Sequence, residues 1–270
     1  MSFISNARMY SVTPEIEAVW RDMLARVAEE AGVTMAYTPC PAPQPLESLW
    51  ARPDLGCVFM CGYPVALHMA DVVPLAAPVP RAHWAKGVPV YRTDFIVRRD
   101  GPFQTLQDTF GHHFGWTVAH SHSGFNAPRH HLLQYRTPQR RALFGAAIGN
   151  LVTARAILDA VVAGRIDCGP LDGYWHLLIA RHKPELVAQL RVVASTDCAP
   201  MPPLVASPAL GAEAIARLKA ALAAAHDRPW FARLADELLI ERFEPVEQAD
   251  FALTLAWDRQ AKADGYETIV

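Results

Sequence analysis

Short apolar runs and helix-like stretches alternate along the chain from its first residues. Apolar side chains recur at three- and four-residue spacing between Ile16 and Val27, which predicts an amphipathic helix. Thr13 suits the N-cap of this helix, and Gly32 suits its end. Residues 3–10 before the helix and 55–60 after it are apolar and extended in pattern, which predicts two strands.

The same alternation continues to the C-terminus. Thr153 caps a predicted helix that Gly164 ends, and Asp172 opens another that ends before Pro184. This order favours an α/β fold with a mainly parallel sheet. Further strands are predicted over 88–97, 115–119, 166–171 and 190–195, and further helices over 46–50, 212–225, 229–239 and 246–263.

The alternation of predicted strands and helices is interrupted and begins again twice along the chain, which predicts two α/β lobes. We expect one lobe over 1–95 plus 196–270 and the other over 96–195, with the crossing segments 91–97 and 193–201 acting as a hinge. A ligand would then bind in the crevice at the carboxyl ends of strands from both lobes.

Composition and charge argue against general disorder, nucleic-acid binding and membrane insertion. The 270 residues can bury a full core, and 51 % of them are hydrophobic, which excludes general disorder. A formal net charge of −2 gives no basic footprint for nucleic acid. No apolar stretch is long enough to insert across a membrane.

The N-terminal ten residues contain neither a basic segment nor a long apolar one, so they do not form a signal peptide. As written, the protein is expected in the cytoplasm, or in the periplasm if its native chain starts further upstream. The five cysteines are scattered and do not form a disulfide framework. Cys57 and Cys61 in particular are expected to be buried free thiols.

Motifs for cofactors and for hydrolysis are missing from the sequence. There is no Gly-x-Gly-x-x-Gly and no Walker-type loop, so no nucleotide cofactor is expected. A Gly-x-Ser-x-Gly nucleophile elbow is missing too. The sequence therefore predicts neither a cofactor nor a catalytic residue.

The most informative stretch is Ser121-His-Ser-Gly-Phe-Asn-Ala-Pro128. It follows the apolar run 114–118 and precedes a helix-like run from Arg129 onward. Hydroxyls and backbone N–H groups at the start of a helix bind anions, because the unpaired donors and the helix dipole favour negative charge there. The alternative at this stage is a plain serine N-cap.

Three segments together resemble the phosphonate-type substrate-binding proteins of ABC transporters, which have the two-lobed type II periplasmic-binding-protein fold. In that family a strand leads to a ligand-facing tyrosine, here Tyr63, and a Ser-Thr-Ser-Gly turn binds the anion. His122 stands where the turn usually has threonine. A later aspartate, here Asp172, faces the ligand cleft. The segments are 54–66, 121–128 and 164–172.

The resemblance implies a protein that closes on a small anionic ligand, such as a phosphonate, phosphate or related oxyanion, and delivers it to a partner such as an ABC transporter permease. Asp172 would recognise a cationic or hydroxyl-bearing part of the ligand, or act only as an N-cap. His122 would donate to the anion when protonated, or face outward. The candidate ligand-binding residues are Tyr10, Tyr63, Tyr91, Ser121, His122, Ser123, Gly124, Phe125, Asp172 and Thr196.

Two other hypotheses remain open at this stage. The lack of a signal segment also suits a cytoplasmic enzyme on the same fold, similar to chorismate dehydratase, or a ligand sensor.

Six histidines also lie close together in the sequence, but no pair of them has zinc-site spacing. His120 and His122 would share one strand face, which leaves a partial metal site open. The six are His112, His113, His120, His122, His130 and His131.

Overall fold

The chain forms two units, which a computed structural model describes over residues 3–270. The first contains the residues up to Tyr91 together with Pro200–Ala252, and the second contains Arg92–Ala199 together with Leu253–Val270. The lobes expected from the sequence differ from these units mainly at the C-terminus, because residues 253–270 pack within the second unit.

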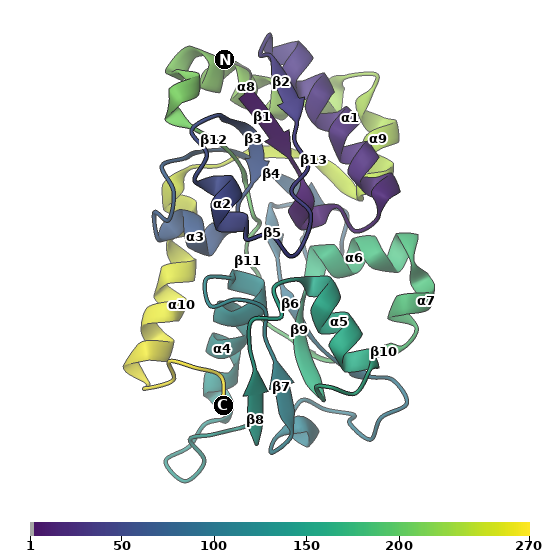
Figure 1. The fold of residues 1–270 in the computed structure, drawn as a ribbon, viewed down its shortest axis with the longest axis vertical. Coiled ribbons are helices and arrows are strands. Elements are labelled where there is room, and N and C mark those ends of the chain that lie inside the picture. The colour runs from purple at the N-terminus through teal and green to yellow at the C-terminus, as the bar shows by residue number, and fades with distance from the viewer. Residues whose placement is uncertain (1–2) are drawn as a thin grey trace. The chain divides into compact units, whose positions relative to one another are not determined.

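The first unit is built on a six-stranded sheet with the order β13-β4-β12-β3-β1-β2 (Figure 1). β1 is parallel to β2 and β3, whereas the remaining pairs are antiparallel. The strands are β1 (Phe3–Asn6), β2 (Met35–Tyr37), β3 (Leu55–Phe59), β4 (Val73–Pro80), β12 (Leu204–Ala206) and β13 (Ile240–Pro245). Its helices are α1 (Pro14–Ala31), α2 (Leu46–Trp50), α3 (Gly62–Ala66), α8 (Ala212–Ala224) and α9 (Phe231–Leu238).

Helix α1 forms where its local signals predict it. The Thr13 side chain accepts a hydrogen bond from the Ile16 N–H at 3.3 Å, and Gly32 ends the helix at a φ of 61° that favours glycine. Trp20 and Met23 on its inner face are fully buried, and the helix packs against α8 and α9. This burial stabilises the helix more than its intrinsic propensity does.

The second unit is built on a five-stranded sheet with the order β10-β6-β9-β7-β8. Its strands are β6 (Thr93–Arg98), β7 (His113–Gly115), β8 (Ala146–Ile148), β9 (Cys168–Asp172) and β10 (Leu190–Ser195). Its helices are α4 (Ala127–Leu132), α5 (Ala154–Val162), α6 (Gly173–His182), α7 (Pro184–Val187) and α10 (Ala252–Ala263), which starts where the chain enters this unit for the second time. Short strands β5 (Val90–Tyr91) and β11 (Ala199–Pro200) pair with each other.

The expectation of mainly parallel sheets is wrong, because both sheets are mixed. β6 is antiparallel to both β9 and β10, and β12 is antiparallel to both β3 and β4. β6 and β12 each follow directly on a passage of the chain between the units. Neither strand is therefore preceded by the crossover helix that a parallel partner requires.

Several predicted element bounds shift around residues 121–126, which we call the serine turn. The expected strand over 115–119 is β7, which ends at Gly115, and the expected strand over 88–97 is divided into β5 and β6. Helical structure begins with a π-helical turn over His122–Asn126, earlier than the expected Arg129. Strands β12, of three residues, and β13, of six residues, were not predicted.

The last residues of the chain belong to the core of the second unit. Tyr266 and Ile269 are buried in the same hydrophobic cluster as Phe95 and Phe114 of the sheet. The Leu143 N–H donates to the Val270 carbonyl at 2.8 Å. These contacts explain why residues 253–270 fold with the second unit.

Two expectations from composition can be compared with the structure. The five thiols are free, and Cys57 and Cys61 are both buried. Cys61 lies beyond the end of β3, however, at the start of α3. Across residues 3–270, no helix combines the length and the apolar character that crossing a membrane would require.

Candidate functional site

The serine turn is held in shape by its own backbone and by one hydroxyl. Ser121 Oγ accepts a hydrogen bond from the Gly124 N–H at 2.9 Å, and the Ser121 carbonyl accepts from the Asn126 N–H at 3.0 Å. The Thr117 N–H donates to the Gly124 carbonyl at 3.2 Å. A Cβ at position 124 would overlap the Thr117 hydroxyl, so this close approach requires glycine.

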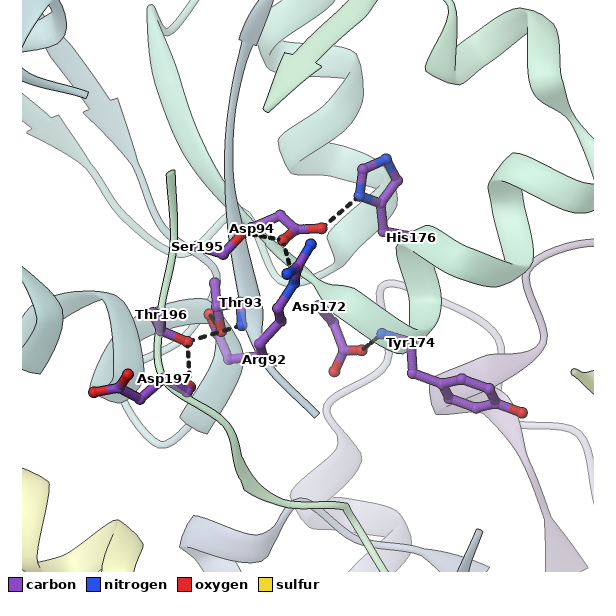
Figure 2. A network of polar contacts seen from close by, with 10 residues as sticks. Arg92, Thr93, Asp94, Asp172, Tyr174, His176, Ser195, Thr196 and Asp197 are labelled. Atoms are coloured by element: carbon purple, nitrogen blue, oxygen red, sulfur yellow. Dashed lines mark hydrogen bonds and ion pairs between the residues drawn. The ribbon is translucent and has the colours of Figure 1, made fainter. Parts of the chain in front are cut away.

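Thr93, at the start of β6, joins three of the expected site residues within the second unit. Its hydroxyl donates to the Ser123 carbonyl at 3.1 Å, and its N–H donates to Thr196 Oγ1 at 3.0 Å. The Thr196 N–H in turn donates a hydrogen bond to the Thr93 carbonyl at 2.9 Å. In the β6–β9 ladder Thr93 lies opposite Asp172. Ser123, Asp172 and Thr196 therefore come together around one residue, as Figure 2 shows for the last two.

Asp172 caps helix α6 as the sequence allowed. Its Oδ1 accepts hydrogen bonds from the Tyr174 and Trp175 N–H groups, both at 3.0 Å. The Gly173 N–H donates to the Arg92 carbonyl at 2.8 Å, and a Cβ at position 173 would lie 2.7 Å from that oxygen. Glycine at 173 thus permits the close approach that sets the start of α6 against β6.

Asp94 is the centre of a buried polar cluster next to Thr93 (Figure 2). Its carboxylate contacts Arg92 Nε at 2.9 Å, His176 Nδ1 at 2.8 Å and Ser195 Oγ at 2.6 Å. Burial alone would raise the pKa of this carboxyl, but the His176 and Ser195 hydrogen bonds and the nearby charges lower it overall. Asp94 is therefore ionised, and it holds Arg92 and His176 in fixed positions.

The structure corrects both expectations for His122, which neither faces outward nor carries the positive charge with which it was expected to donate to the anion. The residue is 1 % exposed and stacks on Trp257 with ring centres 5.3 Å apart. Burial, with a contribution from the charge of His130, lowers the pKa of His122 to about 3. The imidazole is therefore neutral near pH 7, and its Nδ1 lies 3.2 Å from Asn126 Nδ2.

Two other residues of the expected site have their side chains engaged within the protein. The Phe125 ring is buried, with its centre 4.9 Å from that of Trp116 and 4.9 Å from the Arg129 guanidinium. A direct ligand contact by Phe125 stays a prediction. The Thr196 hydroxyl donates to the Asp197 carbonyl at 2.8 Å while it accepts from Thr93.

The three expected tyrosines all belong to the first unit, whereas the other seven expected residues belong to the second. Tyr10 is 1 % exposed and packs edge-on against Phe59 with ring centres 5.1 Å apart. Tyr63 lies at the start of α3, and Tyr91 ends β5. Both are buried, and a direct ligand contact by any of the three stays a prediction.

The second unit also contains a pocket of about 430 Å³ that the sequence did not predict as a site. Thr196 is the one expected site residue in its wall. The remaining wall comes from Asp197, which follows β10, and from α4, the residues that follow it, and α10. The lining residues are His130, His131, Leu133, Gln134, Thr196, Asp197, Trp257 and Gln260.

The histidines do not form the partial metal site that the sequence left open. His120 and His122 lie in a turn and a π-helical segment rather than on one strand face. No group of three His, Cys, Asp or Glu side chains is placed to hold a metal ion in the part of the chain that the structure describes.

The sequence reasoning missed Thr93 and the Asp94 cluster. A usable signal was present, because Arg92 and Asp94 interrupt an otherwise apolar strand. Charged residues within a buried strand are expected to be paired. Arg92 pairs with Asp94 itself, but the other partners of Asp94, His176 and Ser195, lie 82 and 101 positions away, which no local pattern could identify.

A comparison with known families matches residues 11–251 to the family described as the periplasmic substrate-binding protein of phosphonate ABC transporters. No curated protein matches the chain at the level of sequence.

Solved structures with a similar fold include two from phosphonate transport. A binding protein component of an ABC phosphonate transporter from Pseudomonas aeruginosa is 16 % identical with a TM-score of 0.80, covering 98 % of this chain and 88 % of that one. PhnD1 from Prochlorococcus marinus, in complex with methylphosphonate, is 15 % identical with a TM-score of 0.77, covering 97 % of this chain and 98 % of that one. At such identities the likeness establishes the fold alone, which is the type II periplasmic-binding-protein fold that the sequence predicted.

Proposed function

Since the chain belongs to the family of periplasmic substrate-binding proteins of phosphonate ABC transporters, we propose that it binds a phosphonate or a related oxyanion at the serine turn. The observation that carries this proposal is the convergence of Ser123, Asp172 and Thr196 around Thr93. Convergent polar groups at the ends of neighbouring strands are typical of small-molecule sites.

The anionic end of the ligand is assigned to residues 121–125. Ser121 Oγ accepts from the Gly124 N–H, and the same hydroxyl still carries a hydrogen with which it can donate to an oxyanion. Ser123 is partly exposed, so its hydroxyl is accessible. The first N–H groups of the helical segment add donors and the positive end of its dipole. His122 contributes packing in this proposal and carries no positive charge.

The other end of the ligand is assigned to Asp172. Its carboxylate caps α6 through Oδ1 and lies opposite Thr93 in the ladder. A carboxylate so close to an anion site would repel a purely anionic ligand. It favours instead a ligand with a cationic or hydroxyl-bearing group beside the oxyanion, such as an aminoalkyl phosphonate.

Delivery of the ligand to an ABC transporter permease is the partner role that family membership supports. Contributions of Tyr10, Tyr63 and Tyr91 to ligand binding are part of the same proposal. The contribution of each tyrosine can be tested by replacing it with phenylalanine, which removes the hydroxyl and keeps the ring.

A calorimetric titration tests the proposal directly. The purified protein is titrated with methylphosphonate, an aminoalkyl phosphonate, inorganic phosphate, a sulfonate and a small carboxylate. We expect saturable binding of the phosphonates and a raised melting temperature, because ligand binding to the folded state stabilises it by mass action. No binding of any oxyanion would refute the proposal.

Ser123→Ala locates the binding to the turn. It removes a hydroxyl that caps nothing, so affinity should fall while the melting temperature without ligand stays near that of the wild type. Thr153→Ala is the matched control, because Thr153 Oγ1 accepts from the Ala156 N–H at the start of α5 in the same unit. The control should lower stability by about 1 kcal/mol and leave affinity unchanged. Equal affinities in wild type and Ser123→Ala would contradict the assignment of the turn.

A further inference from the structure

The C-terminal segment 253–270 packs against the helical segment 122–132, which contains most of the serine turn. His122, Asn126 and Arg129 follow one another at intervals of four and three residues, which places them on one helical face. Each of them contacts the C-terminal segment. The C-terminal segment thus contacts one face of the helical segment at these three residues.

Arg129 makes the central contacts of this interface. Its side chain is 3 % exposed and forms an ion pair with Asp258, whose side chain is 7 % exposed. Its Nη1 donates to the Glu267 carbonyl at 2.8 Å. On the side of the turn, Nη2 lies 3.3 Å from Asn126 Oδ1, and the guanidinium stacks on the Phe125 ring. One residue therefore joins two points of the C-terminal segment to two residues of the turn.

Asn126 and His122 extend the interface along the same face. Asn126 Nδ2 donates to the Thr254 carbonyl at 2.8 Å, and His122 stacks on Trp257. His130 stacks on the Trp257 ring as well, with ring centres 4.7 Å apart, and its Nε2 lies 2.9 Å from Gln260 Oε1. Stacked rings and a buried ion pair allow few alternative geometries.

We propose that Arg129 and Asp258 are positioning residues for ligand binding, through which the C-terminal segment sets the geometry of the serine turn. This inference rests on the proposed function, because it assumes that the turn holds the ligand. Neither residue touches the ligand in the proposal. Both act through Asn126 and Phe125, two residues of the turn that the Arg129 side chain contacts.

A paired variant separates positioning from stability. Arg129→Met with Asp258→Leu removes both buried charges together, and such replacements often leave stability unchanged. The contacts to Asn126 and Glu267 are nevertheless lost. We expect a modestly lowered melting temperature, because the buried Asn126 Oδ1 loses its donor. The dissociation constant for the phosphonate bound by the wild type should rise about two- to thirtyfold, the range seen for residues that modulate a site without contacting its ligand. Asp258→Asn, which leaves the Arg129 charge buried, should lower both stability and affinity.

The matched control is Asp264→Asn. Asp264 pairs with Arg136 and so also joins the C-terminal segment to the region after α4, but Arg136 lies outside the turn. We expect this variant to keep wild-type affinity. Hydrogen exchange of the amides of residues 121–126 should accelerate in the paired variant and stay unchanged in the control, whether or not ligand is present.

The outcomes distinguish the two proposals. Wild-type affinity and wild-type exchange in the paired variant, together with weakened binding in Ser123→Ala, would overturn the positioning role and leave the proposed function standing. Wild-type affinity in Ser123→Ala would overturn both. Equal losses of affinity in the paired variant and in Asp264→Asn would also overturn the positioning role, because general loosening of the C-terminal segment would then suffice.

Discussion

Replacing His122 should make the protein less sensitive to mild acid. The folded chain holds this imidazole neutral, with its pKa lowered from the ordinary 6.5 to about 3, first by burial and then by His130. The unfolded chain takes up the proton near pH 6.5. Because the unfolded state then binds more protons, the contribution to stability is complete above pH 6.5 and is lost as the pH falls from there toward 3.

The magnitude follows from the two pKa values. At pH 5 the unfolded chain is almost fully protonated at this position while the folded chain is not, so unfolding is favoured by about 2 kcal/mol relative to pH 8. His122→Gln cannot titrate, and its side-chain oxygen can still accept from Asn126. The variant should therefore lose about 2 kcal/mol less than the wild type between these two pH values.

Urea unfolding at pH 8, 6 and 5 measures the difference. All other titrating groups are common to both proteins, so their contributions cancel when the variant is compared with the wild type. An identical loss of stability in wild type and His122→Gln would show that His122 titrates normally in the folded state and would refute the reasoning.

Three further predictions concern the turn, its support and a distant cap. Gly124→Ala should cost about 1–3 kcal/mol of stability and weaken methylphosphonate binding, because the new methyl group overlaps the Thr117 hydroxyl; Thr117→Ala should recover part of the loss, and an unaltered melting temperature would contradict the clash. Thr196→Val leaves the Thr93 N–H without its side-chain acceptor and should cost about 1–3 kcal/mol in urea unfolding, whereas Thr196→Ser should not. Thr13→Ala removes the N-cap of α1 and should cost about 1 kcal/mol with the calorimetric affinity unchanged; a weaker affinity would mean that α1 influences the ligand site.

The family resemblance and much of the local structure could be predicted from the sequence. The ends of α1, the start of α5 at Thr153 and the cap at Asp172 all lie where the sequence predicted them. A cap depends on a side chain and the N–H groups two or three residues away, so it is encoded locally. Helical periodicity is equally local, because it depends only on which face of one segment is apolar.

The strand directions and the surroundings of the turn could not be predicted in this way. Charged interruptions in the strand 88–97 were visible, yet His176 and Ser195, the partners of Asp94, are remote in the sequence. His122 was expected to donate to the anion or to face outward, because an isolated pattern does not reveal burial. Its low pKa depends on Trp257 and the other residues that pack around it.

By itself the sequence determined the caps and the apolar faces of helices such as α1 and α5, where the serine turn lies and to which family the chain belongs. Each of these depends on residues that are close together along the chain or on motifs in a fixed order. Only the tertiary structure decided that Thr93 joins the expected site residues and that the C-terminal segment holds the turn through Arg129. These contacts join residues 30 to 138 positions apart. They exist because folding buries polar groups that must then find partners, wherever in the chain those partners happen to be.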